Sequence, residues 1–121
     1  MPVSLKAAPP HSVVLVCDFE SADVPQSMLG GLISAETGCI AVGCLSELDG
    51  ETEFVLGTTN EVDSGQGSAF DGYLETPTRR VVLRSVLGET LLEHEVSQAR
   101  TRVRIWVNHD SEPDRIVVGL G

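Results

Sequence analysis

The 121-residue sequence predicts an all-β protein: an antiparallel β-sandwich of about eight strands with at most one short helical turn. Two observations predict this class. Segments of roughly five to eight residues alternate apolar and polar side chains, as strands with one buried face do. Turn-forming residues separate these segments about every 8–12 residues, which is the spacing of sandwich and barrel folds. The length and the 41% apolar content fit a single domain over residues 1–121.

The first part of the chain is predicted to begin with an extended lead-in over residues 1–11, because three of these residues are proline. Residues 12–20 form the first expected strand. Residues 21–36 place apolar side chains at helical spacing, but Gly30 and Gly31 would cost a helix interior about 1–2 kcal/mol in all. We therefore expect one short helical turn there at most.

Eight further segments have the strand pattern and are bounded by turn signals. They are residues 31–35, 39–45, 52–59, 70–74, 79–86, 90–96, 101–108 and 115–120. Asp49 and Gly50 favour a turn with a positive φ angle between two of these strands. Residues 60–69 contain an Asp-Ser-Gly-Gln-Gly-Ser stretch with no apolar anchor, so they are expected to be a mobile loop.

Charge is distributed very unevenly along the chain. Residues 1–75 carry twelve carboxylates against one cation, Lys6, for a net charge of −11. Residues 76–121 carry seven arginines against six carboxylates, for a net charge of +1, so the whole chain has −10. Nucleic acid and anionic membrane are excluded as expected partners, because both are polyanions. The acidity instead favours a basic protein partner.

The cysteines predict a reducing compartment and no metal or cofactor site. Their number is odd and no Cys-x-x-Cys occurs, and the amino-terminal residues do not form a secretory signal, so we expect a cytoplasmic protein. Cys39 and Cys44 are five residues apart, so on one strand they point to opposite faces and cannot share a metal. Cys17 lies among apolar strand residues and is expected to act as a small hydrophobe.

The last arginine-rich strand places charge and the only tryptophan on one face. Alternation directs Thr101, Val103, Ile105 and Val107 to the core. The expected outward set is Arg100, Arg102, Arg104 and Trp106. Arg80 and Arg84 would join this surface if their strand lies in the same sheet. Two interpretations stay open: a binding surface, since Arg and Trp are frequent hot-spot residues, or simple neutralisation by Glu93, Glu95 and the acidic half of the chain.

Acidic side chains near the Asp-Gly turn form a second candidate site. These residues are Glu47, Asp49, Glu51 and Glu53. With the later carboxylates Glu61, Asp63, Asp71 and Glu75 they raise the alternative of a calcium or small-ligand site, because calcium takes six to eight oxygen ligands. The spacing lacks the alternating pattern of an EF-hand loop, so no metal ligand is assigned.

A remote alternative is a hydrolase that uses His109 and Asp110 as a local acid–base pair. Such an enzyme needs a nucleophilic Ser or Cys beside the pair, and the sequence has no Gly-x-Ser-x-Gly motif. We therefore predict no catalytic residue and no enzyme activity.

Four stretches in order along the chain resemble the competence protein J family of small bacterial proteins, which includes a nuclease inhibitor. The stretches lie at residues 31–42, 70–77, 88–92 and 102–107. More loosely, the layout is similar to small acidic immunity-type inhibitors. The resemblance implies a β-sandwich without catalytic machinery that binds another protein, and it assigns no functional residue. The favoured hypothesis is thus a non-enzymatic acidic binding module, an inhibitor or immunity-type protein that acts on a basic protein such as a nuclease.

Overall fold

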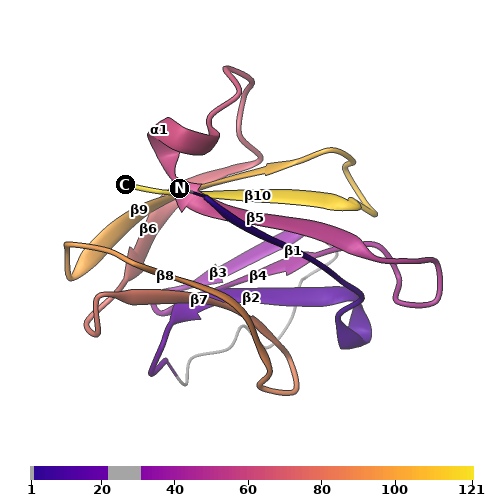
Figure 1. The fold of residues 1–121 in the computed structure, drawn as a ribbon, viewed down its shortest axis with the longest axis horizontal. Coiled ribbons are helices and arrows are strands. Elements are labelled where there is room, and N and C mark those ends of the chain that lie inside the picture. Colours follow the sequence, from indigo (N-terminus) through magenta and orange to yellow (C-terminus); the bar gives the residue numbers. More distant parts are fainter. Residues whose placement is uncertain (1, 22–30) are drawn as a thin grey trace.

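The computed structural model describes residues 2–21 and 31–121, which form two five-stranded sheets packed face to face (Figure 1). In spatial order, the first sheet holds β1 (Val3–Ala7), β5 (Thr52–Thr58), β10 (Arg115–Leu120), β9 (Arg100–Val107) and β6 (Phe70–Glu75). The second holds β3 (Ile33–Glu36), β4 (Cys39–Gly43), β2 (Val13–Asp18), β7 (Arg80–Ser85) and β8 (Thr90–Glu95). The predicted β-sandwich is confirmed.

Strand pairing is antiparallel except between β5 and β10, which run parallel with Arg115 opposite Glu53. The other neighbour of β10 is β9, to which the turn at residues 108–114 connects it in the antiparallel sense. Strand β10 lies between β9 and β5. The turn reverses the chain direction between β9 and β10, and in this direction β10 runs parallel to β5. The sandwich is thus antiparallel, as predicted, with this one parallel pair.

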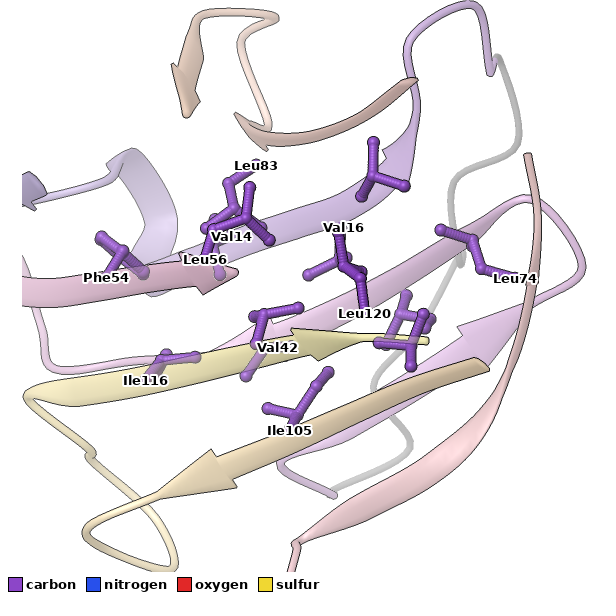
Figure 2. Packing of buried hydrophobic residues seen from close by; sticks show 14 of the residues in the cluster. Val14, Val16, Val42, Phe54, Leu56, Leu74, Leu83, Ile105, Ile116 and Leu120 are labelled. Atoms are coloured by element: carbon purple, nitrogen blue, oxygen red, sulfur yellow. The ribbon is translucent and has the colours of Figure 1, made fainter. Parts of the chain in front are cut away.

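The main core lies between the sheets and is built from alternate residues of both (Figure 2). Its largest fully buried side chains include Phe54, Ile40, Leu56, Leu74, Leu83, Ile105 and Ile116. Each such side chain contributes roughly 1.5–3 kcal/mol through burial. The predicted core face of β9 is confirmed, because Val103 and Ile105 face this core. In β2, Val14 and Val16 face it.

A second, smaller apolar cluster lies on the other face of the second sheet. It consists of Leu15, Cys17, Cys39, Ala41 and Val82, all buried. Strand β2 is therefore apolar on both faces, which explains its unbroken run of apolar residues. Cys39 and Cys44 belong to different clusters, as their spacing predicts.

Residues 1–11 include a paired strand, which the sequence did not predict. Strand β1 pairs with β5 from Val3 opposite Leu56 to Ala7 opposite Thr52. Its prolines lie outside the strand, and a single 3-10 turn, η1 (Pro10–Ser12), follows it. The lead-in is thus an edge strand of the first sheet, because backbone groups on the open side of β5 need partners.

Among the described residues there is one short α-helix, α1 (Thr59–Val62), and it lies at the start of the predicted loop. Thr58 begins it as a capping box, in which its own backbone N–H donates to Glu61 Oε1 at 3.0 Å. In residues 21–36, residues 22–30 lie outside the described part, and Ile33–Glu36 is strand β3. Across the described residues, no helix is long and apolar enough to cross a membrane.

The loop after α1 is attached to β9 at two points. The indole Nε1 of Trp106 donates to the carbonyl oxygen of Gln66 at 3.0 Å. The backbone N–H of Ala69 donates to the carbonyl oxygen of Ile105 at 2.7 Å. The predicted loop at residues 60–69 therefore has anchors that the sequence did not reveal, and both are polar.

Candidate functional site

Two connections meet at one end of the sandwich (Figure 1, right). Residues 44–51 link β4 to β5, and residues 108–114 link β9 to β10. The backbone N–H of Leu45 donates to the carbonyl oxygen of Pro113 at 2.9 Å, so the two connections contact each other directly. We call residues 44–51 and 108–114 the acidic end.

The acidic end carries six carboxylates and no Lys or Arg. They are Glu47, Asp49, Glu51, Asp110, Glu112 and Asp114, and all six residues are exposed. Three come from each connection, so tertiary structure joins two sets that the sequence separates by about sixty residues. The first three were predicted from the sequence as a candidate site, and Asp110 only as a partner of His109; Glu112 and Asp114 were not predicted, although the acids from Asp110 to Asp114 lie close together in the sequence.

An apolar side chain stands at the tip of the acidic end. Leu48 is 92% exposed and lies between Glu47 and Asp49. Ser46 orders this turn, because its Oγ accepts the Leu48 N–H at 3.3 Å and its carbonyl oxygen accepts the Asp49 N–H at 2.9 Å. Gly50 follows with a φ of 139°, a conformation that favours glycine. The turn therefore presents Leu48 to solvent rather than burying it.

A hollow of about 340 Å³ adjoins these carboxylates, and both connections contribute to its lining. Cys44 and Ser46 line it from one connection, and Asp110, Ser111 and Glu112 from the other. Burial raises the pKa of the Cys44 thiol to about 11, so this sulfur stays protonated and is a poor nucleophile at neutral pH.

Glu53, the fourth predicted acid, does not belong to this surface. It lies in β5, and its Oε1 is 3.0 Å from Nε of Arg115. Lys6 in β1 is its register partner on the other side. Two cations therefore flank Glu53, and the same two line a hollow together with Glu51 and Asp114 at the border of the acidic end.

The arginines of β9 are occupied by partners within the molecule. Arg102 binds Asp71 in bidentate fashion, with Nε to Oδ1 at 2.9 Å and Nη2 to Oδ2 at 2.7 Å. The hydrogen bonds from Arg102 lower the pKa of the Asp71 carboxyl below its ordinary value. Arg104 lies 3.5 Å from Asp71 and 3.7 Å from Asp63. The guanidinium of Arg100 stacks on Tyr73, 4.5 Å from the ring centre.

We call the outward side of β9, with Arg100, Arg102, Arg104 and Trp106, the arginine face. These contacts support the interpretation that carboxylates within the molecule neutralise it. The carboxylates come from the acidic half of the chain, as expected, but they are Asp63 and Asp71 rather than Glu93 and Glu95. Trp106 points to the same side as predicted, yet it is only 8% exposed because residues beyond α1 cover it. The predicted Arg and Trp surface is therefore largely satisfied internally.

Arg80 and Arg84 do not join that surface, because β7 belongs to the second sheet. Arg80 lies over the ring of Phe19 at 5.2 Å, and Arg84 Nη2 donates to the Phe19 carbonyl oxygen at 2.8 Å. Both arginines were expected to extend the β9 surface only if β7 and β9 shared a sheet, and the two strands lie in different sheets.

His109 is held as part of a turn and not as a catalytic base. Its Nδ1 accepts the backbone N–H groups of Ser111 at 3.1 Å and Glu112 at 3.0 Å. The Ser111 hydroxyl and the Asp110 carboxylate approach the same nitrogen, at 3.2 and 3.6 Å. A triad needs the serine and the carboxylate on opposite ring nitrogens, so this arrangement cannot relay a proton.

The calcium alternative receives no support from the arrangement of carboxylates. Among the residues that the structure describes, no group of three or more His, Cys, Asp or Glu side chains is placed to hold a metal ion. Asp63 and Asp71 are instead engaged by arginines.

Comparison with known proteins gives a likeness of fold. No family model matches the chain, and no curated protein matches its sequence. Among solved structures, the chain is similar to ComJ from Bacillus subtilis, described as an inhibitor of the DNA-degrading activity of NucA, with a TM-score of 0.71 and 9% identity. The match covers 98% of this chain and 93% of ComJ. The resemblance to the competence protein J family is thus confirmed at the level of the fold.

A second solved structure, described as crocagin biosynthetic gene J, matches with a TM-score of 0.51 and 11% identity. This match covers 98% of this chain and 94% of the other. At such identities, both likenesses concern the path of the backbone and say nothing about individual side chains.

Proposed function

We propose that this protein is a non-enzymatic binding module that docks a basic protein on its acidic end and thereby inhibits it. The observation that supports the proposal is that two contacting connections, which contain no Lys or Arg, together carry six exposed carboxylates and the exposed Leu48. Such a field accelerates the approach of a cationic surface and repels polyanions.

The exposed Leu48 can contribute binding affinity, which exposed carboxylates contribute only weakly. Exposed ion pairs contribute only about 0–1 kcal/mol each, so the charges favour orientation and association rate over affinity. Burying Leu48 under a partner would contribute roughly 1.5–3 kcal/mol. The adjoining hollow, with Asp110 and Glu112 in its lining, is suited to a Lys or Arg side chain of the partner.

A nuclease is the partner class that we favour. Its surface must be basic to bind phosphates, so an array of carboxylates on a rigid domain competes for the same groups. The fold likeness to ComJ, an inhibitor of a nuclease, supports the same class. The arginine face is a weaker candidate, because Asp63 and Asp71 already neutralise much of it.

The test begins by capturing partners from lysate of the source cell at low salt and purifying the basic proteins obtained. Binding is then measured by calorimetry for wild type, for E47Q/D49N/E51Q and for a control, E89Q/E93Q/E95Q. The control removes three exposed carboxylates from β8 and the turn before it, so both variants have the same net charge. We expect the acidic-end variant to bind at least tenfold more weakly than the control.

Equal weakening of the two variants would mean that only overall charge matters, and it would refute the acidic end as the docking surface. Capture of no basic protein would refute the wider proposal. For a captured nuclease, DNA degradation with and without the protein tests inhibition, and unchanged degradation at saturating protein would exclude the inhibitor role.

A further inference from the structure

Two cysteines lie side by side on the outer face of the second sheet. Cys17 in β2 and Cys39 in β4 are direct register partners. Both belong to the smaller apolar cluster and are buried, with Cys17 2% and Cys39 0% exposed. The proposed docking function uses neither of them.

The hydrogen bonds around β4 show which kind of cross-strand pair they form. Gly43 N–H donates to the Leu32 carbonyl oxygen on the β3 side at 2.8 Å, whereas Cys44 N–H donates to the Ser12 carbonyl oxygen on the β2 side at 2.9 Å. Because backbone direction alternates along a strand, Cys39 shares the orientation of Gly43 and bonds toward β3. Cys39 and Cys17 are therefore a non-hydrogen-bonded pair.

Such pairs have the closest approach in an antiparallel sheet, with Cα atoms about 4.5 Å apart. Disulfides span Cα separations of about 4.4–6.8 Å, so this pair falls within the permitted range. Both side chains also project from the same face of the sheet, as their shared cluster shows. No backbone movement is needed to bring the two sulfurs together.

We propose that Cys17 and Cys39 form an oxidisable dithiol that closes to a cross-strand disulfide between β2 and β4. Hydrogen peroxide is an oxidant small enough for this site. Cys17 loses its proton and the thiolate attacks one peroxide oxygen; the O–O bond breaks, and the leaving hydroxide takes up that proton, so that Cys17 sulfenic acid and water are produced. The Cys39 sulfur then attacks the Cys17 sulfur, forming the S–S bond and releasing a second water. Overall, two thiols and one peroxide give one disulfide and two waters.

The environment of the two sulfurs supports this assignment of roles. The hydrogen bond with Cys39 lowers the pKa of the Cys17 thiol, and the nearby positive charge of Arg84 acts in the same direction. Cys44 differs in position and in acidity, since it faces the main core and its pKa is raised to about 11.

The test uses reduced, folded full-length protein treated with hydrogen peroxide and then blocked with a thiol-alkylating reagent after unfolding. Intact mass and peptide mapping identify the bond. We expect wild type and C44A to lose two hydrogens and show only the Cys17–Cys39 link, which dithiothreitol reverses. C17A and C39A should form no intramolecular disulfide. Wild type oxidised in urea is the reference, in which all three pairings become possible.

A native disulfide that includes Cys44 would overturn the proposal. Equal proportions of the three pairings in folded and urea-treated protein would also overturn it, since the sheet would then confer no selection. Failure of folded wild type to form any disulfide while the urea-treated chain does so would show that burial protects the pair, and this too would refute the proposal.

Discussion

Asp71 forms ion pairs with two of the three arginines of β9, Arg102 and Arg104. It lies in β6 opposite Arg104, and its carboxylate accepts two hydrogen bonds from Arg102 while lying 3.5 Å from Arg104. One acid therefore satisfies two guanidinium groups that point outward from β9. The pair is solvent-exposed, so its role is chiefly to fix the orientation of the arginine side chains.

The lowered pKa of Asp71 predicts a specific pH dependence of stability. A carboxyl whose pKa is lower in the folded state stabilises the fold above its unfolded pKa, and this contribution is lost as pH falls through the folded pKa. D71N should therefore melt below wild type at neutral pH, and the difference should shrink as the solution is acidified below pH 4. Thermal melts followed by circular dichroism across this range provide the measurement. A difference that persists or grows in acid would contradict the assignment.

Glycine at position 119 allows α1 to lie against β10. A Cβ at Gly119 would be 3.0 Å from Thr59 Oγ1, 3.0 Å from a ring carbon of Trp106 and 3.2 Å from the Thr59 backbone. The short helix and the buried indole thus share the space that a missing side chain leaves on the strand. This contact explains how the four-residue helix α1 is held against β10.

We therefore predict that G119A destabilises the protein by about 1–3 kcal/mol, as over-packing does in a filled interior. G67A is the matched control, because a Cβ at Gly67 meets nothing within 4 Å and its φ is not positive. Urea unfolding of both variants gives the comparison. Indistinguishable midpoints would show that α1 moves away at little cost.

The whole molecule carries its net charge of −10 asymmetrically, with an acidic end and an arginine face that is compensated internally. Self-repulsion among the exposed carboxylates of the acidic end opposes the folded state, and salt screens it. We therefore expect this surface to reduce the stability of the isolated protein.

Melting temperature should accordingly rise with sodium chloride between low and moderate ionic strength. In E47Q/D49N/E51Q we expect a higher melting temperature at low salt and a smaller rise with salt than in E89Q/E93Q/E95Q, because the removed charges are the clustered ones. Differential scanning calorimetry of the three proteins tests this. Identical salt dependence in the two variants would mean that clustering has no effect on stability.

The alternation of apolar and polar residues along the sequence predicted much of the fold and part of the candidate site. Period-two alternation predicted the faces of β9, and it correctly directed Arg102, Arg104 and Trp106 outward from the core. It could not show that α1 and the loop after it cover Trp106, because that contact joins residues about forty apart. Nor could it place β7 and β9 in different sheets, which separates Arg80 and Arg84 from the β9 arginines.

By itself, the sequence determined the all-β class, most strand positions and the uneven charge, since these depend on residues adjacent along the chain. Only the tertiary structure decided that residues 44–51 and 108–114 form one acidic end, that Asp71 neutralises β9, and that Cys17 faces Cys39. Each of these depends on strand order and register. Those properties are set by long-range pairing and packing, for which a single sequence contains no local signal.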